Sequence, residues 1–413
     1  MSATVTTEPL NPFDGTVGDA RTAHRPLKVL YVIDHVSTVG GAERFVVGLA
    51  QHMPRTRVEP WVCSTRAMDR SAAALLSDAG VACINLGRST KWDVHRLLGL
   101  ASLIRRQRFD VVHAHKFGSN VWATLIASAC EVPVVVAQEH TWAYSGNRLR
   151  LWLDRHLVGR LATRFVAVSN RDRERMIAIE GVPEAKAMVM PVPHIPHEAS
   201  QSADIRSELG LEAKVPVLAT AAVLRPQKAF EVLLQAHARV LEAVPDAQLI
   251  IAGDGPCRSE LEELVERLGI AASVHMLGRR TDVDAILRRV DVGVMSSDFE
   301  GMPQFVFECM AAGIPIVATA VGGLPEIVRD GHTGLLVPPR DPSALARALT
   351  DVLTDKALAR RLASASAARR DEFTITSVAG KYAALYETLV EGIRSSGTSR
   401  GESIGEEPVS WNH

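Results

Sequence analysis

The strongest constraint on the fold is a repeated alternation of short segments rich in β-branched residues with longer segments of helical periodicity. LKVLYVID (27–34) is the first strand-like segment and PIVAT (315–319) is the last. Strands that alternate with helices along a chain form parallel sheets covered by helices. We therefore expect an α/β protein with two Rossmann-like, doubly wound parallel sheets. The predicted strands are residues 27–34, 60–65, 110–115, 133–138 and 164–169 in the first half, and 215–224, 248–253, 273–278, 292–297 and 315–319 in the second.

The chain is long enough for two such domains, because 413 residues exceed what one hydrophobic core usually supports. A polar segment, HIPHEASQSADIRSELGLEAK, separates the two sets of strands. We predict a first domain at 26–195, a linker at 196–214 and a second domain at 215–376. Ligands are expected beyond the carboxyl ends of the strands, in a cleft between the domains. The polar ends of the chain, residues 1–25 and 395–413, are predicted to be disordered.

Composition excludes several classes of protein. With 47% hydrophobic residues, 23% charged residues and a formal net charge of −1, the chain is an ordinary globular protein. Its five cysteines stand apart without CxxC spacing, so we expect no zinc site, no disulfide framework and a reducing, cytoplasmic location. The start, MSATVTTEPL, lacks the pattern of a signal peptide, and no apolar run reaches the about 18 residues of a membrane-spanning helix.

Motifs in the first half place candidate ligand-binding groups at the ends of strands. In STVGGAER, Gly40 and Gly41 open a helix, where the backbone can approach an anion. A plain strand-to-helix turn has the same pattern, and the dinucleotide fingerprint GxGxxG is missing. In VHAHKF and QEHTWAY, His115 and His140 stand at strand ends, where an imidazole can hydrogen-bond a hydroxyl or carbonyl group. His115 is thus a candidate contact for an acceptor or sugar. Buried structural histidines would fit these positions equally well, and the further ligands of a metal site are not found.

A pair of cations marks the start of the second half. Arg225 and Lys228 lie in VLRPQKAF, which connects a predicted strand to a predicted helix. An arginine fork and a lysine point charge beside a helix entry suit a diphosphate. Two chance surface cations would give the same pattern.

Two carboxylates in EGMPQFVFECMAAG form the next candidate group. Pro303 favours the first turn of a helix, so Glu300 is expected just before the helix and Glu308 inside it. Carboxylates on either side of a helix start are suited to gripping hydroxyl groups at both ends of a nucleotide sugar, whereas an acid and base pair comes from facing elements. The helix start itself, whose backbone is expected to face phosphate oxygens, comprises Gly301, Met302, Pro303 and Gln304.

A basic amphipathic helix is predicted within residues 148–164. RLRLWLDRHLVGRL has leucines and Trp152 at helical spacing among several arginines. Such a helix can hold anionic lipid headgroups or a polyanionic acceptor, and an ordinary solvated face is the alternative. Nucleic acid is not expected as a partner, because no recognised binding motif accompanies the charge.

These motifs together resemble the retaining glycosyltransferases of family 4, which share the two-domain GT-B fold. The resemblance extends from about Leu27 to Leu389. Its most specific part is the pair of glutamates, separated by seven residues and followed by GIPIVAT and GGLPEIV. The matching segments are GGAER, HAHKF, the strand end at His140, RPQK, IIAGDGP, EGMPQFVFECMAAGIPIVAT, GGLPEIV and DGHTGLLVPP.

The resemblance implies a role for each candidate residue. Arg225 and Lys228 are expected on the donor diphosphate, Glu308 on the ribose hydroxyls and Glu300 on the transferred sugar. The other implied contacts are His140 near the reacting carbon of the sugar, Gly41 near the donor phosphates, and the backbone of Leu277 and Gly278 at the base. A helix at 377–394 is expected to cross back onto the first domain. Three departures stand out: Ala222 and Ala229 replace frequent glycines, and Gln304 replaces a frequent Asn or Gly.

The implied reaction moves a hexosyl or N-acetylhexosaminyl group from a nucleotide diphosphate sugar to an acceptor hydroxyl, with retention of configuration. UDP is the first expected nucleotide and GDP the second, and a saccharide or lipid-linked acceptor in cell-surface polysaccharide or glycolipid synthesis is expected. No metal or other cofactor is required, because fixed cations already stabilise the leaving diphosphate. The alternatives are a nucleotide-sugar epimerase, a sugar phosphorylase, and a catalytically silent nucleotide-sugar-binding protein.

Overall fold

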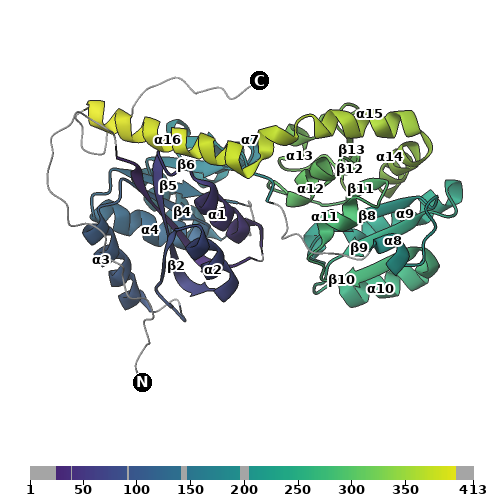
Figure 1. Ribbon diagram of the computed structural model, residues 1–413, viewed down its shortest axis with the longest axis horizontal. Helices are drawn as coiled ribbons and strands as arrows, with labels where there is room; N and C mark the ends of the chain where they lie inside the picture. The colour runs from purple at the N-terminus through teal and green to yellow at the C-terminus, as the bar shows by residue number, and fades with distance from the viewer. Residues whose placement is uncertain (1–24, 39, 91–92, 141–146, 196–203, 397–413) are drawn as a thin grey trace.

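The computed structural model contains two parallel α/β domains that lie side by side, joined by a single connection and by a long helix at the C-terminus (Figure 1). It describes residues 25–38, 40–90, 93–140, 147–195 and 204–396. The predicted fold class, two doubly wound parallel sheets, is confirmed. The predictions of disordered ends concern almost entirely residues outside these ranges, as does the first part of the predicted linker, residues 196–203, while the rest of that linker is described and contains a short helix at Ile205–Glu208.

The first domain is built on a seven-stranded parallel sheet in the order β3-β2-β1-β4-β5-β6-β7. Both faces of its central strand are buried, since Val29, Tyr31 and Ile33 face one core cluster while Leu30 and Val32 face another. This two-sided burial explains the nearly continuous apolar sequence of β1. The strands are β1 (Leu27–Val36), β2 (Val58–Met68), β3 (Ala82–Asn85), β4 (Val111–His115), β5 (Val134–Gln138), β6 (Arg164–Ala167) and β7 (Ala187–Val189).

Helices cover both faces of this sheet (Figure 1). They are α1 (Gly41–His52), α2 (Arg70–Asp78), α3 (Leu97–Gln107), α4 (Phe117–Ala129), α5 (Arg148–Leu153), α6 (Gly159–Leu161) and α7 (Asn170–Arg175), with short 3-10 helices η1 (Val94–Arg96) and η4 (Glu184–Lys186). Two π-helical segments, η2 (Asp154–Val158) and η3 (Met176–Glu180), follow α5 and α7.

The second domain is built on a six-stranded parallel sheet in the order β10-β9-β8-β11-β12-β13. The strands are β8 (Val217–Ala221), β9 (Gln248–Ala252), β10 (Val274–Gly278), β11 (Val292–Met295), β12 (Ile316–Thr319) and β13 (Leu335–Val337). The helices are α8 (Ile205–Glu208), α9 (Phe230–Ala243), α10 (Arg258–Arg267), α11 (Val283–Leu287), α12 (Gln304–Ala312), α13 (Leu324–Ile327), α14 (Pro342–Thr354) and α15 (Lys356–Ala367), with 3-10 helices η5 (Pro226–Lys228), η6 (Ala271–Ser273) and η7 (Arg370–Phe373).

The last helix, α16 (Ile375–Ser396), returns from the second domain and lies along the first (Figure 1). Its residues Val378, Tyr382 and Tyr386 belong to the same buried cluster as Tyr31 and Phe45 of the first domain. A bidentate ion pair between Arg57 and Glu387, at 2.8 and 2.5 Å, holds its outer side. Because α16 completes the core of the first domain, the two domains cannot separate freely.

Several elements differ from those that the sequence predicts. The short strands β3, β7 and β13 were not predicted, because none of them carries a long β-branched run. The helix predicted within residues 148–164 is confirmed over the segment RLRLWLDRHLVGRL: α5, the π-helical η2 and α6 follow one another without a break from Arg148 to Leu161, and Arg164 begins β6. The predicted tail begins too early, since α16 extends to Ser396. None of the helices in the described part of the chain combines the length and the apolar character needed to span a bilayer.

Candidate active site

Lys228 and Glu300 form the central contact of the second domain's binding edge. The Nζ of Lys228 lies 2.6 Å from Oε1 of Glu300, and the hydroxyl of Ser297 donates to the same oxygen at 2.6 Å. Glu300 is only 7% exposed, so its charge needs these partners. The structure therefore brings together two residues that the sequence assigned separately to a diphosphate and a sugar.

Hydrogen bonds to backbone carbonyls hold together the two loops that carry Lys228 and Glu300. The amide of Asp298 donates to the carbonyl of Gln227 at 2.9 Å, and the side-chain amide of Gln227 donates to the carbonyl of Phe299 at 3.2 Å. The hydroxyl of Ser296 donates to the carbonyl of Lys228 at 2.9 Å. The loop after β8 and the loop after β11 thus form one hydrogen-bonded unit at the carboxyl edge of the sheet.

The alanine that directly follows Lys228 has a strained backbone. Ala229 is buried and has φ 47° and ψ 46°, which is the left-handed region that favours glycine. It ends η5 and immediately precedes α9. The alanine noted as a departure in the sequence thus adopts a conformation that a glycine would adopt more easily.

The start of α12 lies between the two predicted carboxylates. Pro303 is the N-cap residue of this helix, whereas the sequence predicted it in the first turn, so the helix starts one residue later than expected. No side chain caps the first turn. Its first backbone N–H groups are thus available to an anion. Glu308 lies inside the helix and is 4% exposed. Glu300 before the helix and Glu308 within it have the arrangement that the sequence predicts.

The other predicted donor contacts lie after β8 and at the end of β10, two strands of the second domain that have β9 between them. Arg225 is exposed and makes no ion pair within the described residues. Leu277 and Gly278 end β10, and the carbonyl of Gly278 accepts from the amide of Gly253 at 2.8 Å. Gly253 cannot carry a side chain, because a Cβ there would lie 1.9 Å from the carbonyl oxygen of Ala222. Contacts of Arg225, Leu277 and Gly278 with a donor stay predictions.

In the first domain, the glycine pair opens α1 as predicted from the sequence. Gly40 is the N-cap residue with φ 96°, and a Cβ there would lie 2.6 Å from an oxygen of Glu43. A Cβ on Gly41 would meet no atom within 4 Å, which leaves open space above the helix start. Three residues further, the guanidinium of Arg44 donates to the carbonyl of Ile195 at the exit from the domain.

Arg44 also lies within electrostatic reach of the second domain. Burial lowers the pKa of Arg44 below its usual value, and the negative charges of Glu308 and Asp284 oppose this shift. The positive charge of Arg44 in α1 thus interacts electrostatically with Glu308, the carboxylate that is expected to hold ribose. Arg44 was not assigned a role from the sequence, although its motif GGAER was recognised.

The histidines of β4 and β5 form one buried cluster. Nδ1 of His115 lies 3.1 Å from Nε2 of His140, and the rings of His113 and His115 have centroids 4.1 Å apart. Phe45 meets His140 edge-on at 5.0 Å. His115 is fully buried, and its described contact is with His140. Its predicted contact with an acceptor or sugar stays a prediction; its hydrogen-bonding contact in the structure is with a ring nitrogen of His140.

The helix α16 reaches this cluster from behind. The hydroxyl of Tyr386 lies 2.7 Å from Nδ1 of His113, and the hydroxyl of Tyr382 donates to Oε1 of Gln138 at 3.1 Å. Burial lowers the pKa of His113 and of His140 to about 3, and lowers that of His115 well below its usual value. The imidazoles are therefore neutral near pH 7, which suits hydrogen bonding rather than ion pairing.

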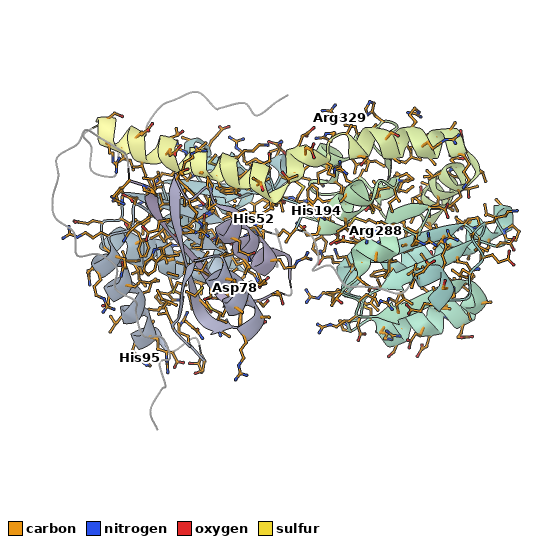
Figure 2. All side chains as sticks on the ribbon, in the orientation of Figure 1. His52, Asp78, His95, His194, Arg288 and Arg329 are labelled. Carbon is orange, nitrogen blue, oxygen red and sulfur yellow. The ribbon has the colours of Figure 1, made fainter. Side chains whose placement is uncertain are left out.

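Two side chains connect the donor loops directly to the first domain. Gln304, at the start of α12, accepts from the amide of Ile195 at 3.2 Å and donates to the carbonyl of Pro193 at 3.0 Å. Its side chain is therefore used at the connection between the domains, which passes His194 (Figure 2). The donor contact predicted for this helix start would involve its backbone.

The second connection is made by Glu326 of α13. Its carboxylate accepts from the amide of Asn170 at 2.8 and 3.0 Å, from the side-chain amide of Asn170 at 2.9 Å and from the amide of Arg171 at 3.4 Å. A carboxylate of one domain thus caps the helix α7 of the other. Nearby, a Cβ on Gly323 would lie 2.6 Å from the carbonyl of Gly301 and 2.9 Å from Cβ of Ser169. Glu326 and Asn170 were not predicted from the sequence, although GGLPEIV was recognised.

Comparison with known proteins agrees with this geometry. Residues 39–193 match the model described as Glycosyltransferase Family 4, and residues 201–369 match the model described as Glycosyl transferases group 1. A D-inositol 3-phosphate glycosyltransferase of Streptomyces bingchenggensis is 30% identical over 325 residues, which are 73% of this chain and 71% of the relative. The chain belongs to glycosyltransferase family 4.

Other relatives and solved structures extend the comparison. The UDP-Gal:alpha-D-GlcNAc-diphosphoundecaprenol alpha-1,3-galactosyltransferase of Escherichia coli is 26% identical over 284 residues, which are 64% of this chain and 72% of that protein. The crystal structure of Anabaena HepE in complex with UDP has a TM-score of 0.75 and 20% identity, and covers 88% of this chain and 100% of HepE. The crystal structure of WaaG, a glycosyltransferase involved in lipopolysaccharide biosynthesis, has a TM-score of 0.67 and 16% identity, with 87% and 99% covered. The family 4 chain therefore has the GT-B architecture and is a glycosyltransferase that uses nucleotide sugars.

Proposed function

We propose that this family 4 glycosyltransferase transfers a hexosyl or N-acetylhexosaminyl group with retention of configuration. The proposed donor is a UDP-sugar, and a GDP-sugar is the next candidate. The observation that carries the proposal is the pairing of Lys228 with Glu300 beside the uncapped start of α12, which holds Glu308 one turn further along. Lys228, Arg225 and the helix start present positive charge to the diphosphate as it leaves. Glu300 and Glu308 accept hydrogen bonds from the hydroxyls of the sugar and the ribose. No described side chain has the setting of a covalent nucleophile, so attack occurs from the face that the diphosphate leaves.

His140 is the first domain's contribution to the reacting sugar. Its neutral imidazole, oriented by His115, presents a hydrogen-bonding group beside the strand end. Gly41, with open space around it, allows the donor phosphates to approach the start of α1. Closure of the two domains would bring these groups onto a donor held by the second domain and exclude water.

The decisive experiment screens the purified protein against UDP-, GDP- and ADP-sugars by ligand-induced thermal shift. Stabilisation by one nucleotide sugar, followed by NMR assignment of the product's anomeric configuration, supports the proposal; an inverted product refutes retention. An epimerase would interconvert nucleotide sugars without an acceptor, and a phosphorylase would need inorganic phosphate. Binding of a nucleotide sugar without turnover in the presence of any tested acceptor would identify a catalytically silent nucleotide-sugar-binding protein.

The reaction is proposed to need no metal or other cofactor. Among the described residues, no group of three or more His, Cys, Asp or Glu side chains is arranged to hold a metal ion. The cations Arg225 and Lys228 supply the electrostatic stabilisation that a metal would otherwise give. Turnover should be unchanged after exhaustive EDTA treatment, and a loss restored by added Mg²⁺ or Mn²⁺ would contradict this part of the proposal.

The acceptor is proposed to be a saccharide or a lipid-linked precursor in cell-surface polysaccharide or glycolipid synthesis, reached from the cytoplasm. The names of the two relatives above give a phosphate-bearing acceptor in each case. A peripheral contact with anionic membrane through residues 148–164 is part of the proposal. It is supported by two exposed apolar side chains, Leu149 at 65% and Trp152 at 56%, next to Arg148. Co-sedimentation with anionic vesicles tests it, with Trp152→Ala expected to weaken binding and unchanged partitioning counting against it.

A further inference from the structure

A buried arginine in the first domain has no anionic partner. Arg88 follows β3 and is only 4% exposed. Its Nε is fully buried and makes no hydrogen bond, and no ion pair to its guanidinium occurs within the described residues. The guanidinium carbon lies 5.9 Å from the centre of the Trp122 ring. A buried cation held only against an aromatic face is costly, and an anion would compensate the charge.

Two carboxylates at this end of the sheet, Asp93 and Asp34, accept hydrogen bonds from other donors. Asp93, in the same loop as Arg88, accepts from the amide and hydroxyl of Ser89 at 2.8 and 2.7 Å and from the amide of Thr90 at 3.1 Å. Asp34, at the end of β1, accepts from the hydroxyls of Thr65 and Ser119. These two carboxylates therefore accept hydrogen bonds from neighbouring residues, and neither of them forms an ion pair with Arg88.

The position of Arg88 is fixed by the fold. Its amide donates to the carbonyl of Thr65 at 3.0 Å, which ties it to β2, and Trp122 lies in the second turn of α4. Strands β3, β2, β1 and β4 are consecutive neighbours in the parallel sheet, so their carboxyl ends share one edge. His115 ends β4 at this edge, and His140 contacts it. Ligands of such sheets bind beyond the carboxyl ends of the strands.

Two further cations stand at the same edge, but both already have carboxylate partners. Nζ of Lys116 lies 2.6 Å from Oε1 of Glu43, and Nε of Arg66 lies 3.9 Å from Oδ2 of Asp34. Arg66 and Lys116 are therefore paired with carboxylates, whereas Arg88 forms no ion pair among the described residues, not even with Asp93 in its own loop.

We propose that Arg88, stacked on Trp122, binds a phosphate group of the acceptor. The inference rests on the proposed function, since it assumes that the first domain receives the acceptor. It adds the acceptor's chemical class and a binding residue. The arginine fork donates two parallel hydrogen bonds to the phosphate oxygens, and the indole ring keeps the fork planar and in place.

Isothermal titration of inorganic phosphate tests the site in protein saturated with UDP, so that the donor diphosphate site is filled. Wild type should bind phosphate, and Arg88→Met should bind it about tenfold to a hundredfold more weakly, because a charge-assisted bond of this kind is lost. Arg106→Met is the matched control, since Arg106 is an exposed arginine of the same domain that donates only to Ser102, and its phosphate affinity should be unchanged. Equal phosphate affinity in wild type and Arg88→Met overturns the proposal.

A second variant keeps the test decisive if Arg88→Met fails to fold. Arg88→Lys keeps the charge and loses the fork, so phosphate affinity should fall by roughly threefold to tenfold while UDP affinity stays that of wild type. No change in phosphate affinity in Arg88→Lys and in Trp122→Leu would also overturn the proposal. Failure of wild type to bind UDP would instead refute the proposed function, and the two failures are thereby distinguished.

The phosphate could belong to a soluble molecule or to a lipid, and a second arm separates these sources. Glycerol 1-phosphate in solution and phosphatidylcholine vesicles with phosphatidic acid are compared as competitors of bound phosphate. Competition by the soluble ester alone assigns a water-soluble acceptor, and competition by the vesicles assigns a lipid-linked one. Arg88→Met should abolish whichever competition is seen; competition that survives in this variant contradicts the site.

Discussion

Removal of the Glu326 carboxylate should weaken the contact between the domains without changing donor binding. Glu326 makes three short hydrogen bonds to Asn170 and a longer one to the amide of Arg171, while Ser169 already caps the same helix through the amide of Asp172 at 3.1 Å. The carboxylate is therefore an additional cap, and helix caps contribute about 1 kcal/mol, with a further few tenths for charge at a helix N-terminus. Asn170 is exposed, so water replaces part of this contact in Glu326→Ala.

A loss of about 1–2 kcal/mol lowers the equilibrium constant between the joined and the separated arrangement by roughly 5- to 30-fold. We expect kcat/KM of Glu326→Ala for the nucleotide sugar to fall within this range. UDP affinity, measured by calorimetry, should stay within about twofold of wild type, because the expected UDP contacts other than that of Gly41 lie in the second domain. Glu326→Gln keeps an acceptor oxygen and should lose less. Asn170→Ala removes only the 2.9 Å side-chain bond, and its effect should not add fully to that of Glu326→Ala. Wild-type kcat/KM in Glu326→Ala, or full additivity in the double variant, would refute the reasoning.

Three further predictions concern the core of the site. Lys228→Ala should lower kcat by about a hundredfold to a thousandfold, because it removes a fixed cation at the leaving diphosphate and one of the partners of buried Glu300. Turnover equal to wild type would exclude a role of Lys228 in stabilising the leaving diphosphate. Ala229→Gly should stabilise the protein by about 1 kcal/mol, measured as the urea midpoint, since glycine relieves the left-handed strain at φ 47°; a lower midpoint would show that the strain is compensated. His113 has a folded pKa of about 3 against about 6.5 unfolded, so the unfolded chain gains a proton first as pH falls. Between pH 6.5 and 5 wild type should therefore lose about 2 kcal/mol relative to His113→Gln, and parallel pH profiles of the two proteins would contradict this.

The overall architecture could be predicted from the sequence because a buried parallel strand has a distinct pattern. β1, β4, β5, β8 and β9 are each largely buried on both faces and have predominantly apolar sequences without alternation. The edge strand β3 has no fully buried residue and β7 and β13 have only three residues each, so their pattern is too short to separate from loop. Hydrogen bonding to a neighbouring strand, which no local pattern reports, is what defines them.

The candidate site was predictable in its residues and less so in their partners. The resemblance pointed to Lys228 and Glu300 individually, but their pairing joins positions 72 residues apart. The contact of Glu326 with Asn170 joins two domains across 156 residues, and no spacing rule relates them. His115 shows the opposite limit: its place at a strand end was predicted, while its complete burial depends on side chains distant in the sequence, such as Phe45 of α1.

The pairing of Lys228 with Glu300 also explains how one lysine can serve two roles. An ammonium group has three N–H donors, and Glu300 takes one of them. The remaining donors can reach a phosphate oxygen while the first keeps the ammonium fixed, so the cation need not move when the diphosphate leaves. Ser297 donates to the same Glu300 oxygen that binds Lys228, which leaves the other carboxylate oxygen for a sugar hydroxyl. In the proposed mechanism the carboxylate therefore orients the sugar with one oxygen and the leaving-group cation with the other, and a change at either residue should alter both donor affinity and turnover.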